Sequence, residues 1–84
     1  MNLNADILRT IGSITEFSVI QIEAHGETNE YVIKEVSDDS LDLVMLNAEN
    51  AFWDGGFVSI EEIKNRLAAD YSIGIITEIA VSKN

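Results

Sequence analysis

Short stretches of alternating apolar and polar residues, separated by turn-forming residues, dominate the first half of the chain. In the segment 17–24, which is rich in β-branched residues, Ile20, Ile22 and Ala24 fall on one face of a strand. Two further alternating segments follow at about ten-residue spacing, a pattern typical of an antiparallel β-meander. The expected strands are 17–24, 31–36 and 41–46.

The second of these strands has an expected orientation. Period-two alternation places Tyr31, Ile33 and Glu35 on one face and the residues between them on the other. Turn-forming residues bound this strand on both sides, in the segments 25–29 (HGETN) and 37–40 (SDDS). The two turns therefore join the three strands of the meander.

A short helix is expected before the meander. Asn4 can cap it, and Ile7, Leu8 and Ile11 lie on one of its faces. Gly12 is suited to the position that follows the last helical turn. This pattern predicts an amphipathic helix at the start of the chain.

A capping box marks the start of a second helix. Ser59 can cap this helix, and the side chain of Glu62 can reach back to the cap. Ile60, Ile63 and Leu67 then recur at the spacing of a core-facing stripe. The sequence therefore predicts an amphipathic helix that packs against the sheet.

The region between the meander and this helix contains an aromatic cluster. The segment 47–57 is expected to be a loop, with Phe52, Trp53 and Phe57 around an Asp-Gly-Gly turn. One interpretation is that the three aromatic residues close one end of the core. The other is that they form an exposed anchor at an interface, where tryptophan is enriched among the residues that dominate binding.

A fourth strand is expected over 73–81, where Ile73, Ile75, Thr77, Ile79 and Val81 share one face. The resulting order is α-β-β-β-α-β, which predicts an α+β fold with helices packed on one face of an antiparallel sheet. The 84 residues contain no proline and no visible linker, so we expect a single domain spanning residues 1–84.

Composition narrows the class of protein. With 46% apolar residues, the chain is too hydrophobic for a disordered acidic tail. The absence of cysteine excludes disulfides, thiolate zinc sites and cysteine nucleophiles. No apolar stretch approaches the roughly 18 residues of a membrane span, and the chain starts with polar residues and no basic targeting segment. We therefore expect a soluble, cytoplasmic domain.

The acidic residues are concentrated in the middle of the chain. The net charge is −10, and the segment 10–63 holds 12 acidic residues against one basic residue, Lys34. This charge would repel DNA, RNA and anionic membranes, so we expect no direct binding to any of them. Two interpretations remain: a solvated surface that keeps a small protein soluble, or a negative face that binds a basic partner.

Residues suited to catalysis are scarce. His25 is the only histidine, and it lies beside glycine in an expected turn. Asp38 and Asp39 are adjacent in another turn, unlike a buried carboxylate pair. The segment 38–50 lacks the central glycine of a calcium loop, and the Gly-Gly pair at 55–56 is too short to hold phosphates. We therefore expect a protein that is not an enzyme and has no cofactor and no metal.

Three stretches resemble one family. They are residues 1–4 (MNLN) followed by Asp6, Ile7, Leu8, Arg9 and Ile11, the segment 16–19 (EFSV), and the segment 29–33 (NEYVI) followed by Glu35 and the acidic residues up to Ser40. These stretches are similar to those of phage-encoded anti-CRISPR proteins that inhibit Cas9. The resemblance implies an N-terminal helix, a three-stranded meander and a further helix. It also implies a non-enzymatic inhibitor, active in the host cytoplasm, whose carboxylates occupy the basic groove where Cas9 reads the short duplex flanking its target.

The resemblance also implies a set of partner-binding residues. Those that match the family are Glu16, Asn29 and Glu30, and those in the adjoining acidic stretch are Glu35, Asp38 and Asp39. The partner would be a basic nucleic-acid-binding protein, for example a Cas nuclease. On physical grounds, carboxylates on a rigid sheet can pair bidentately with the arginines of a phosphate-binding groove.

A rival resemblance points to a different class of protein. The segment 39–44 (DSLDLV) is similar to the Asp-Ser-Leu motif of acyl carrier proteins, and the segment 72–74 (SIG) resembles the start of their last helix. This resemblance implies an all-helical bundle with phosphopantetheine on Ser40. A third hypothesis is a structural or assembly protein whose charge serves solubility alone. The leading hypothesis is an acidic inhibitor or interaction module that mimics nucleic acid.

Overall fold

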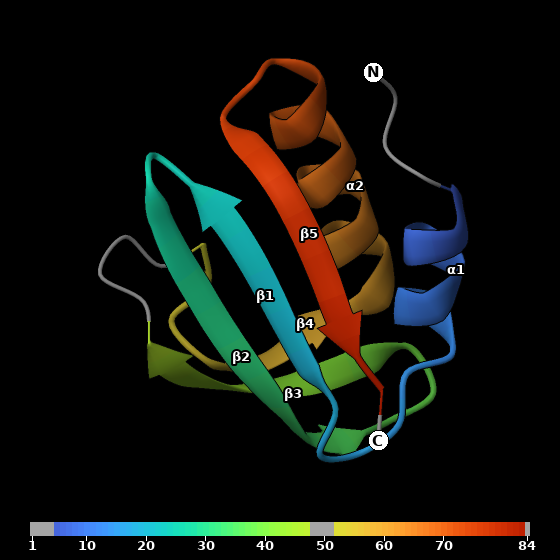
Figure 1. The fold of residues 1–84 in the computed structure, drawn as a ribbon. Helices are drawn as coiled ribbons and strands as arrows, with labels where there is room; N and C mark the ends of the chain where they lie inside the picture. The colour runs from blue at the N-terminus through green and yellow to red at the C-terminus, as the bar shows by residue number, and fades with distance from the viewer. Residues whose placement is uncertain (1–4, 48–51, 84) are drawn as a thin grey trace.

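The computed structural model describes residues 5–47 and 52–83, which form an α+β domain (Figure 1). The predicted fold class is confirmed, and the helices, the three-strand meander and the last strand follow one another as expected. One short strand, β4, is additional. The elements are α1 (Ala5–Gly12), β1 (Val19–Ala24), β2 (Glu27–Val36), β3 (Ser40–Asn47), β4 (Gly56–Ser59), α2 (Ile60–Ser72) and β5 (Ile76–Ser82). Asn4, the expected cap of the first helix, lies outside the described residues.

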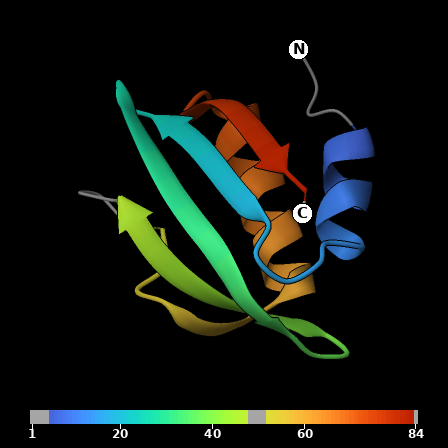
Figure 2. The ribbon, with the colours of Figure 1, turned by 60° about the horizontal axis from the view of Figure 1, so that its bottom comes forward.

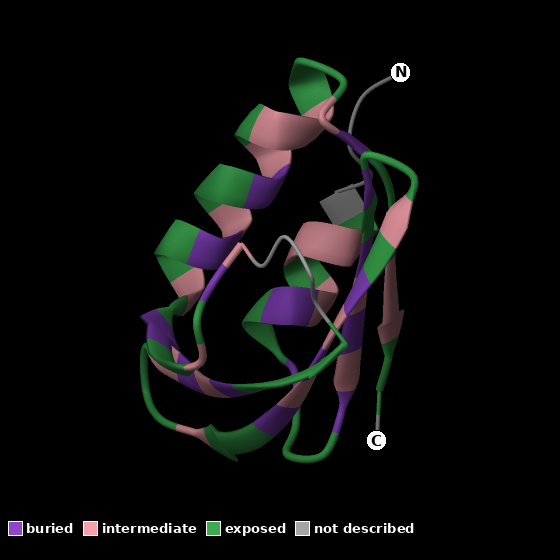
Figure 3. Cartoon of the chain, turned by 90° about the vertical axis from the view of Figure 1, so that its left-hand side faces the viewer, coloured by how far each residue is buried: buried purple, intermediate pink, exposed green. Residues whose placement is uncertain are grey.

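The five strands form one antiparallel sheet in the order β4-β3-β2-β1-β5. The long strand β2 lies between β1 and β3 (Figure 2). After the meander the chain passes through β4 and α2, and β5 then pairs with the free side of β1. Both helices lie on one face of the sheet, as expected (Figures 1 and 3). We call the opposite face the open face.

The turn between β1 and β2 is tighter than the sequence indicates. It consists of His25 and Gly26, whose φ angles are both positive, at 55° and 76°. This mirror-image geometry matches the twist of the paired strands, whereas ordinary turns would splay them. β2 therefore begins at Glu27, within the segment 25–29 that was expected to be the turn.

The start of α2 agrees with its predicted cap. The Ser59 hydroxyl accepts a hydrogen bond from the backbone N–H of Glu62 at 3.0 Å. Ile63 and Leu67 are fully buried on the expected stripe. The end of this helix differs from the prediction, because Ile73 is its C-cap residue and is 69% exposed rather than part of the last strand.

The end of α1 also differs from the prediction. Gly12 is the last helical residue and does not have a positive φ, so it is not the left-handed residue that follows the helix. A Cβ atom at this position would lie 2.8 Å from the Nζ atom of Lys64 on α2. The glycine therefore gives the lysine of the neighbouring helix room to approach.

The sheet is irregular and strongly curved. The pairing of β2 with β3 contains two register shifts, and the pairing of β1 with β5 contains one. Each inserted residue bends its strand and increases the local twist. Because α2 contacts both edge strands, β4 and β5, the sheet curls around this helix. The open face is therefore the convex side of the sheet.

One of these shifts reverses the predicted orientation of Glu35. Simple alternation places Glu35 on the same face as Tyr31 and Ile33. The register shift after Ile33 instead pairs Glu35 with Asp42, which lies on the open face between two buried leucines. Val36 packs against the core in its place. A bulge of this kind adds one residue and so exchanges the two faces of the strand beyond it.

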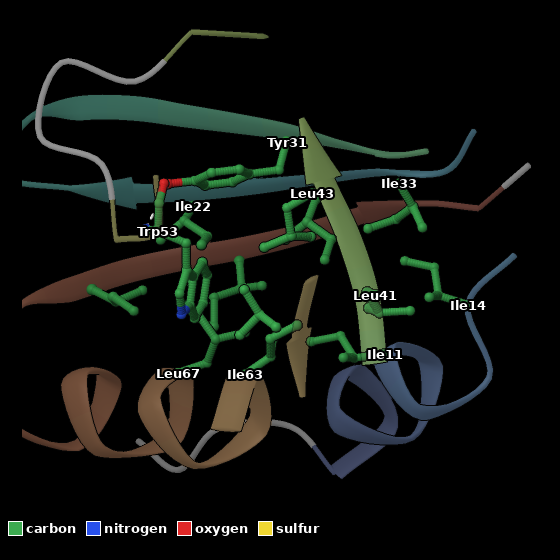
Figure 4. Close-up of a cluster of buried hydrophobic side chains, with 14 of the residues drawn as sticks. Ile11, Ile14, Ile22, Tyr31, Ile33, Leu41, Leu43, Trp53, Ile63 and Leu67 are labelled. Carbon is green, nitrogen blue, oxygen red and sulfur yellow. Dashed lines mark hydrogen bonds between the residues drawn. The ribbon is translucent and has the colours of Figure 1, made fainter. Parts of the chain in front are cut away.

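The core lies between the sheet and the helices (Figure 4). It includes Ile20, Ile22 and Ala24 of β1, as the alternation predicts. The other buried apolar residues are Ile11, Ile14, Tyr31, Ile33, Leu41, Leu43, Trp53, Val58, Ile63, Leu67, Ile76 and Ile79.

Tyr31 and Trp53 pack edge to face, with their ring centroids 5.8 Å apart. The Tyr31 hydroxyl accepts from the Trp53 N–H at 3.2 Å and donates to the Trp53 carbonyl at 3.1 Å.

The aromatic cluster divides between the two faces of the sheet. Trp53 is only 8% exposed and belongs to the core, and Phe52 packs against it. The guanidinium of Arg66 lies 5.1 Å from the centre of the Phe52 ring and donates to the Phe52 carbonyl at 2.6 Å. Phe57 is 57% exposed. Two of the three residues thus close the core, and Phe57 alone projects from it.

Candidate interaction surface

The open face of the sheet carries no helix or strand of the described chain (Figure 3). Its side chains are those that alternate with the buried residues of each strand. The pairing registers arrange them in rows that run across the strands. Neighbouring strands lie about 4.8 Å apart, so side chains in one row are in direct reach of one another.

Five carboxylates share the open face. Glu23, Glu30 and Asp42 each lie between two buried residues of their own strand. Glu35 is paired with Asp42, and Glu78 is paired with Glu23. The five residues are Glu23, Glu30, Glu35, Asp42 and Glu78. We call them the open-face carboxylates. Lys34 is exposed next to Glu35 and is the only basic residue between positions 10 and 63.

Two pairs of these carboxylates occupy directly paired positions, Glu23 with Glu78 and Glu35 with Asp42. Glu23 and Glu78 occupy paired positions on β1 and β5, and both are exposed. They line a shallow hollow together with Gln21, Thr28 and Ala80. Like charges at directly paired positions oppose strand pairing, so this arrangement costs stability. A positive charge placed over the hollow would offset the repulsion.

Glu30 is held in place on the central strand. Its Oε2 atom accepts a hydrogen bond from the amide of Gln21 on β1 at 2.9 Å. The side chain is half-buried between its neighbours. A restrained carboxylate loses less side-chain entropy when it pairs with a cation than a free one does.

An apolar row crosses the same face between the carboxylates. Val19, Val32 and Val44 occupy paired positions on β1, β2 and β3. Phe57 lies opposite Asp42 on β4 and therefore diagonally next to Val44, which is 39% exposed. We call these four residues the apolar seam. Glu35 and Asp42 lie on one side of the three valines, in the row that ends at Phe57, and Glu23, Glu30 and Glu78 lie on the other side.

The basic residues of the helices do not neutralise the open face. Arg9 pairs with Asp6 at 3.0 Å, and Arg66 lies 3.6 Å from Asp70. Each pair belongs to one helix, and both helices lie on the opposite side of the sheet. These two arginines therefore place no positive charge on the open face, where Lys34 lies beside Glu35.

The structure divides the residues predicted to bind a partner. Glu30 and Glu35 lie on the open face, about 16 Å apart along β2 by the usual strand rise. Asp38 and Asp39 lie in the turn between β2 and β3 and line a hollow beside the start of α2. Glu16 is exposed in the connection between α1 and β1. The predicted set is thus spread over more than one surface.

Asn29 requires a correction. It is 1% exposed on the core face of β2, so it cannot contact a partner as the resemblance implies. Its amide donates to the carbonyl of Ile22 at 3.4 Å. Its Oδ1 atom has no hydrogen-bond partner among the described residues.

The turn that holds Asp39 is tied to the second helix. The Asp39 carbonyl accepts from the N–H of Ile60 at 2.8 Å, and its carboxylate accepts from the Ser40 hydroxyl at 2.9 Å. The carboxylate also lies near the positive end of α2, which favours negative charge. The role that these contacts indicate for Asp39 is to hold β3 against the start of the helix.

The position of Ser40 argues against a carrier protein. Ser40 begins strand β3, whereas the carrier resemblance requires a helix after the serine. Residues 17–36, which that resemblance requires as a loop, contain the β1–β2 hairpin. The strand and the hairpin are incompatible with the all-helical bundle of a carrier protein.

The described residues contain neither a metal-binding group nor a membrane-spanning helix. His25 is exposed in its turn. Among the described residues, no group of three or more histidine, cysteine, aspartate or glutamate side chains could hold a metal ion. Within the same residues, neither helix has the length and apolar character needed to cross a membrane.

The chain matches no protein-family model, and comparison with curated proteins and with solved structures finds no significant match.

Proposed function

We propose that this protein is a non-enzymatic inhibitor or interaction module that binds a basic, nucleic-acid-handling protein through the open face of its sheet. The observation that carries the proposal is the set of five carboxylates on a convex, uncovered face, with Lys34 as the nearby base. By covering a groove that binds phosphates, the acidic face excludes nucleic acid from it. The partner proposed first is a Cas nuclease, because of the stretches that resemble an anti-CRISPR protein.

Electrostatics favour such a complex in two ways. Carboxylates pair with arginine through short, charge-assisted hydrogen bonds, and two parallel bonds fix the orientation. A negative face also accelerates the encounter with a positive groove, an effect that falls as salt rises. The sheet presents its carboxylates from paired strands, so little backbone order is lost on binding.

A binding assay at two salt concentrations tests the proposal. The protein is immobilised and presented with a Cas9-type nuclease and with other nucleic-acid-binding proteins at 50 mM and 300 mM salt. The Debye length falls by about 2.4-fold between these two concentrations. We expect a basic protein to be retained at low salt and released at high salt. If none is retained, the proposal is wrong.

A pair of matched variants locates the contact. The triple variant Glu30→Gln, Glu35→Gln and Asp42→Asn removes three charges from the open face. A control variant, Asp38→Asn with Glu61→Gln and Glu62→Gln, removes three charges beside the start of α2, on the helix side of the sheet. We expect at least a tenfold loss of affinity for the first variant and less than a threefold loss for the control. Equal losses would show that net charge alone is responsible.

One observation favours an assembly protein as the second candidate. β3 extends past the end of β4, and in this overhang Val44, Met45 and Leu46 are all exposed. Exposed apolar residues at a strand edge favour self-association. A defined homo-oligomer in size-exclusion chromatography with light scattering would support assembly, and a monomer at micromolar concentration would support the inhibitor.

A further inference from the structure

We infer that the partner surface is not purely basic: the apolar seam of the open face docks on apolar or aromatic side chains that lie between two groups of arginine or lysine. This combination is the chemistry of a single-strand nucleic-acid-binding groove, where basic residues follow the backbone and aromatic residues stack on bases. The inference rests on the proposed function and specifies the class of partner site.

The apolar seam crosses the sheet among the open-face carboxylates. Val19, Val32 and Val44 form one row across three strands, and Phe57 extends it toward β4. Carboxylates lie on both sides of this row. A partner that contacts carboxylates on both sides must therefore also cover the seam.

Covering the seam removes water from exposed apolar side chains. Phe57 is 57% exposed and Val44 is 39% exposed, so both lose water contact on docking. Apolar groups gain free energy when other apolar groups replace that water, and they gain nothing from a charged surface. A purely basic surface would instead have to desolvate its own cations over the seam. Matching apolar side chains remove this penalty.

The net charge of the chain favours one kind of partner for the open face. A second copy of the protein would bring another net charge of −10 to a face that is itself acidic. Repulsion of this kind opposes pairing of two open faces. Charge complementarity therefore favours a basic partner over self-association through the seam.

Two synthetic peptides of equal charge test the inference with the intact protein. One peptide alternates arginine with tryptophan, and the other alternates arginine with serine. We expect the wild-type protein to bind the arginine–tryptophan peptide at least tenfold more tightly in isothermal titration calorimetry. Equal affinity for the two peptides would overturn the inference while leaving the proposed function intact. Binding to neither peptide would contradict the proposed function itself.

Single variants assign the difference to the seam. Phe57→Thr is expected to remove most of the preference for the tryptophan peptide, and Val44→Thr part of it, since threonine retains the β-propensity of both positions. The control Ile73→Thr removes a similarly exposed apolar side chain at the end of α2 and is expected to leave the preference unchanged. A preference that survives both seam variants would contradict the inference.

Salt dependence separates the two kinds of contact. The slope of log affinity against log salt reports the ion pairs, so the seam variants are expected to leave it unchanged. The triple carboxylate variant is expected to reduce this slope for both peptides. A stable homodimer that Phe57→Thr dissociates would assign the seam to a second copy and overturn the inference. Circular dichroism spectra that match the wild type confirm that each variant is folded.

Discussion

The hydroxyl of Tyr31 is expected to stabilise the core through two hydrogen bonds to the backbone. It bridges the N–H and the carbonyl of Trp53 at 3.2 Å and 3.1 Å, in a part of the core where both residues are buried. The variant Tyr31→Phe keeps the ring but leaves both backbone groups without this partner. An unsatisfied buried polar group costs about 1–3 kcal/mol, so we expect the free energy of unfolding to fall by about 2–3 kcal/mol.

The assay is urea denaturation followed by the fluorescence of Trp53, the only tryptophan, and by circular dichroism. With an m-value of about 1 kcal/mol/M for a chain of this size, the midpoint is expected to fall by about 2–3 M urea. The control is Tyr71→Phe, because the Tyr71 hydroxyl has no hydrogen-bond partner among the described residues, and its midpoint is expected to stay within error of the wild type. A change below about 0.5 kcal/mol for Tyr31→Phe would refute the reasoning, since it would mean that other partners replace the hydroxyl.

Three further predictions concern stability. Phe17 is 65% exposed and has a φ of 66°, so Phe17→Gly, which relieves the strain of a left-handed backbone, is expected to raise the melting temperature in calorimetry; a fall would show that contacts of the ring outweigh the strain. Ser59→Ala removes the hydrogen bond to the Glu62 N–H and is expected to cost about 1 kcal/mol in urea titration, whereas Ser59→Asp retains the cap and the wild-type stability. Glu78→Gln removes the repulsion from Glu23 and is expected to raise the melting temperature at low salt, with a gain that shrinks at 1 M salt; a gain independent of salt would contradict this cause.

Local signals explain why much of the fold could be predicted from the sequence. The capping box identified the start of α2 because it reports a hydrogen bond between near neighbours, from the Glu62 N–H to Ser59. The alternation of Ile20, Ile22 and Ala24 identified the core face of β1 because the strand pairs regularly over that stretch. Both features depend on residues close together in the chain.

The errors lie where pairing between distant segments decides the structure. The register shift that turns Glu35 to the open face arises in the pairing of β2 with β3, and strict period-two alternation cannot represent it. Ile73 was placed in a strand because isoleucines recur every second residue there. Gly74, with a φ of 81°, was the available signal that the helix extends to this point, because glycine commonly follows a helix in the left-handed conformation.

The candidate surface was predictable only in part. The family resemblance led to Glu30 and the adjoining acidic stretch to Glu35, and both residues lie on the open face. Glu78 was missed because it lies far along the chain and reaches Glu23 only through the pairing of β5 with β1. Phe57 was grouped with Phe52 and Trp53, and its separation from them became apparent only when β4 placed it on the other side of the sheet.

The position of β5 has a consequence for how the chain folds during synthesis. β1 is synthesised before β5, which is one of its two neighbours in the sheet. Until β5 emerges from the ribosome, β1 has an unpaired edge, and such edges recruit other strands. The growing chain therefore has to keep this edge apart from other nascent chains until β5 is available. Contacts so distant in sequence also slow folding, because the loop must close before they form.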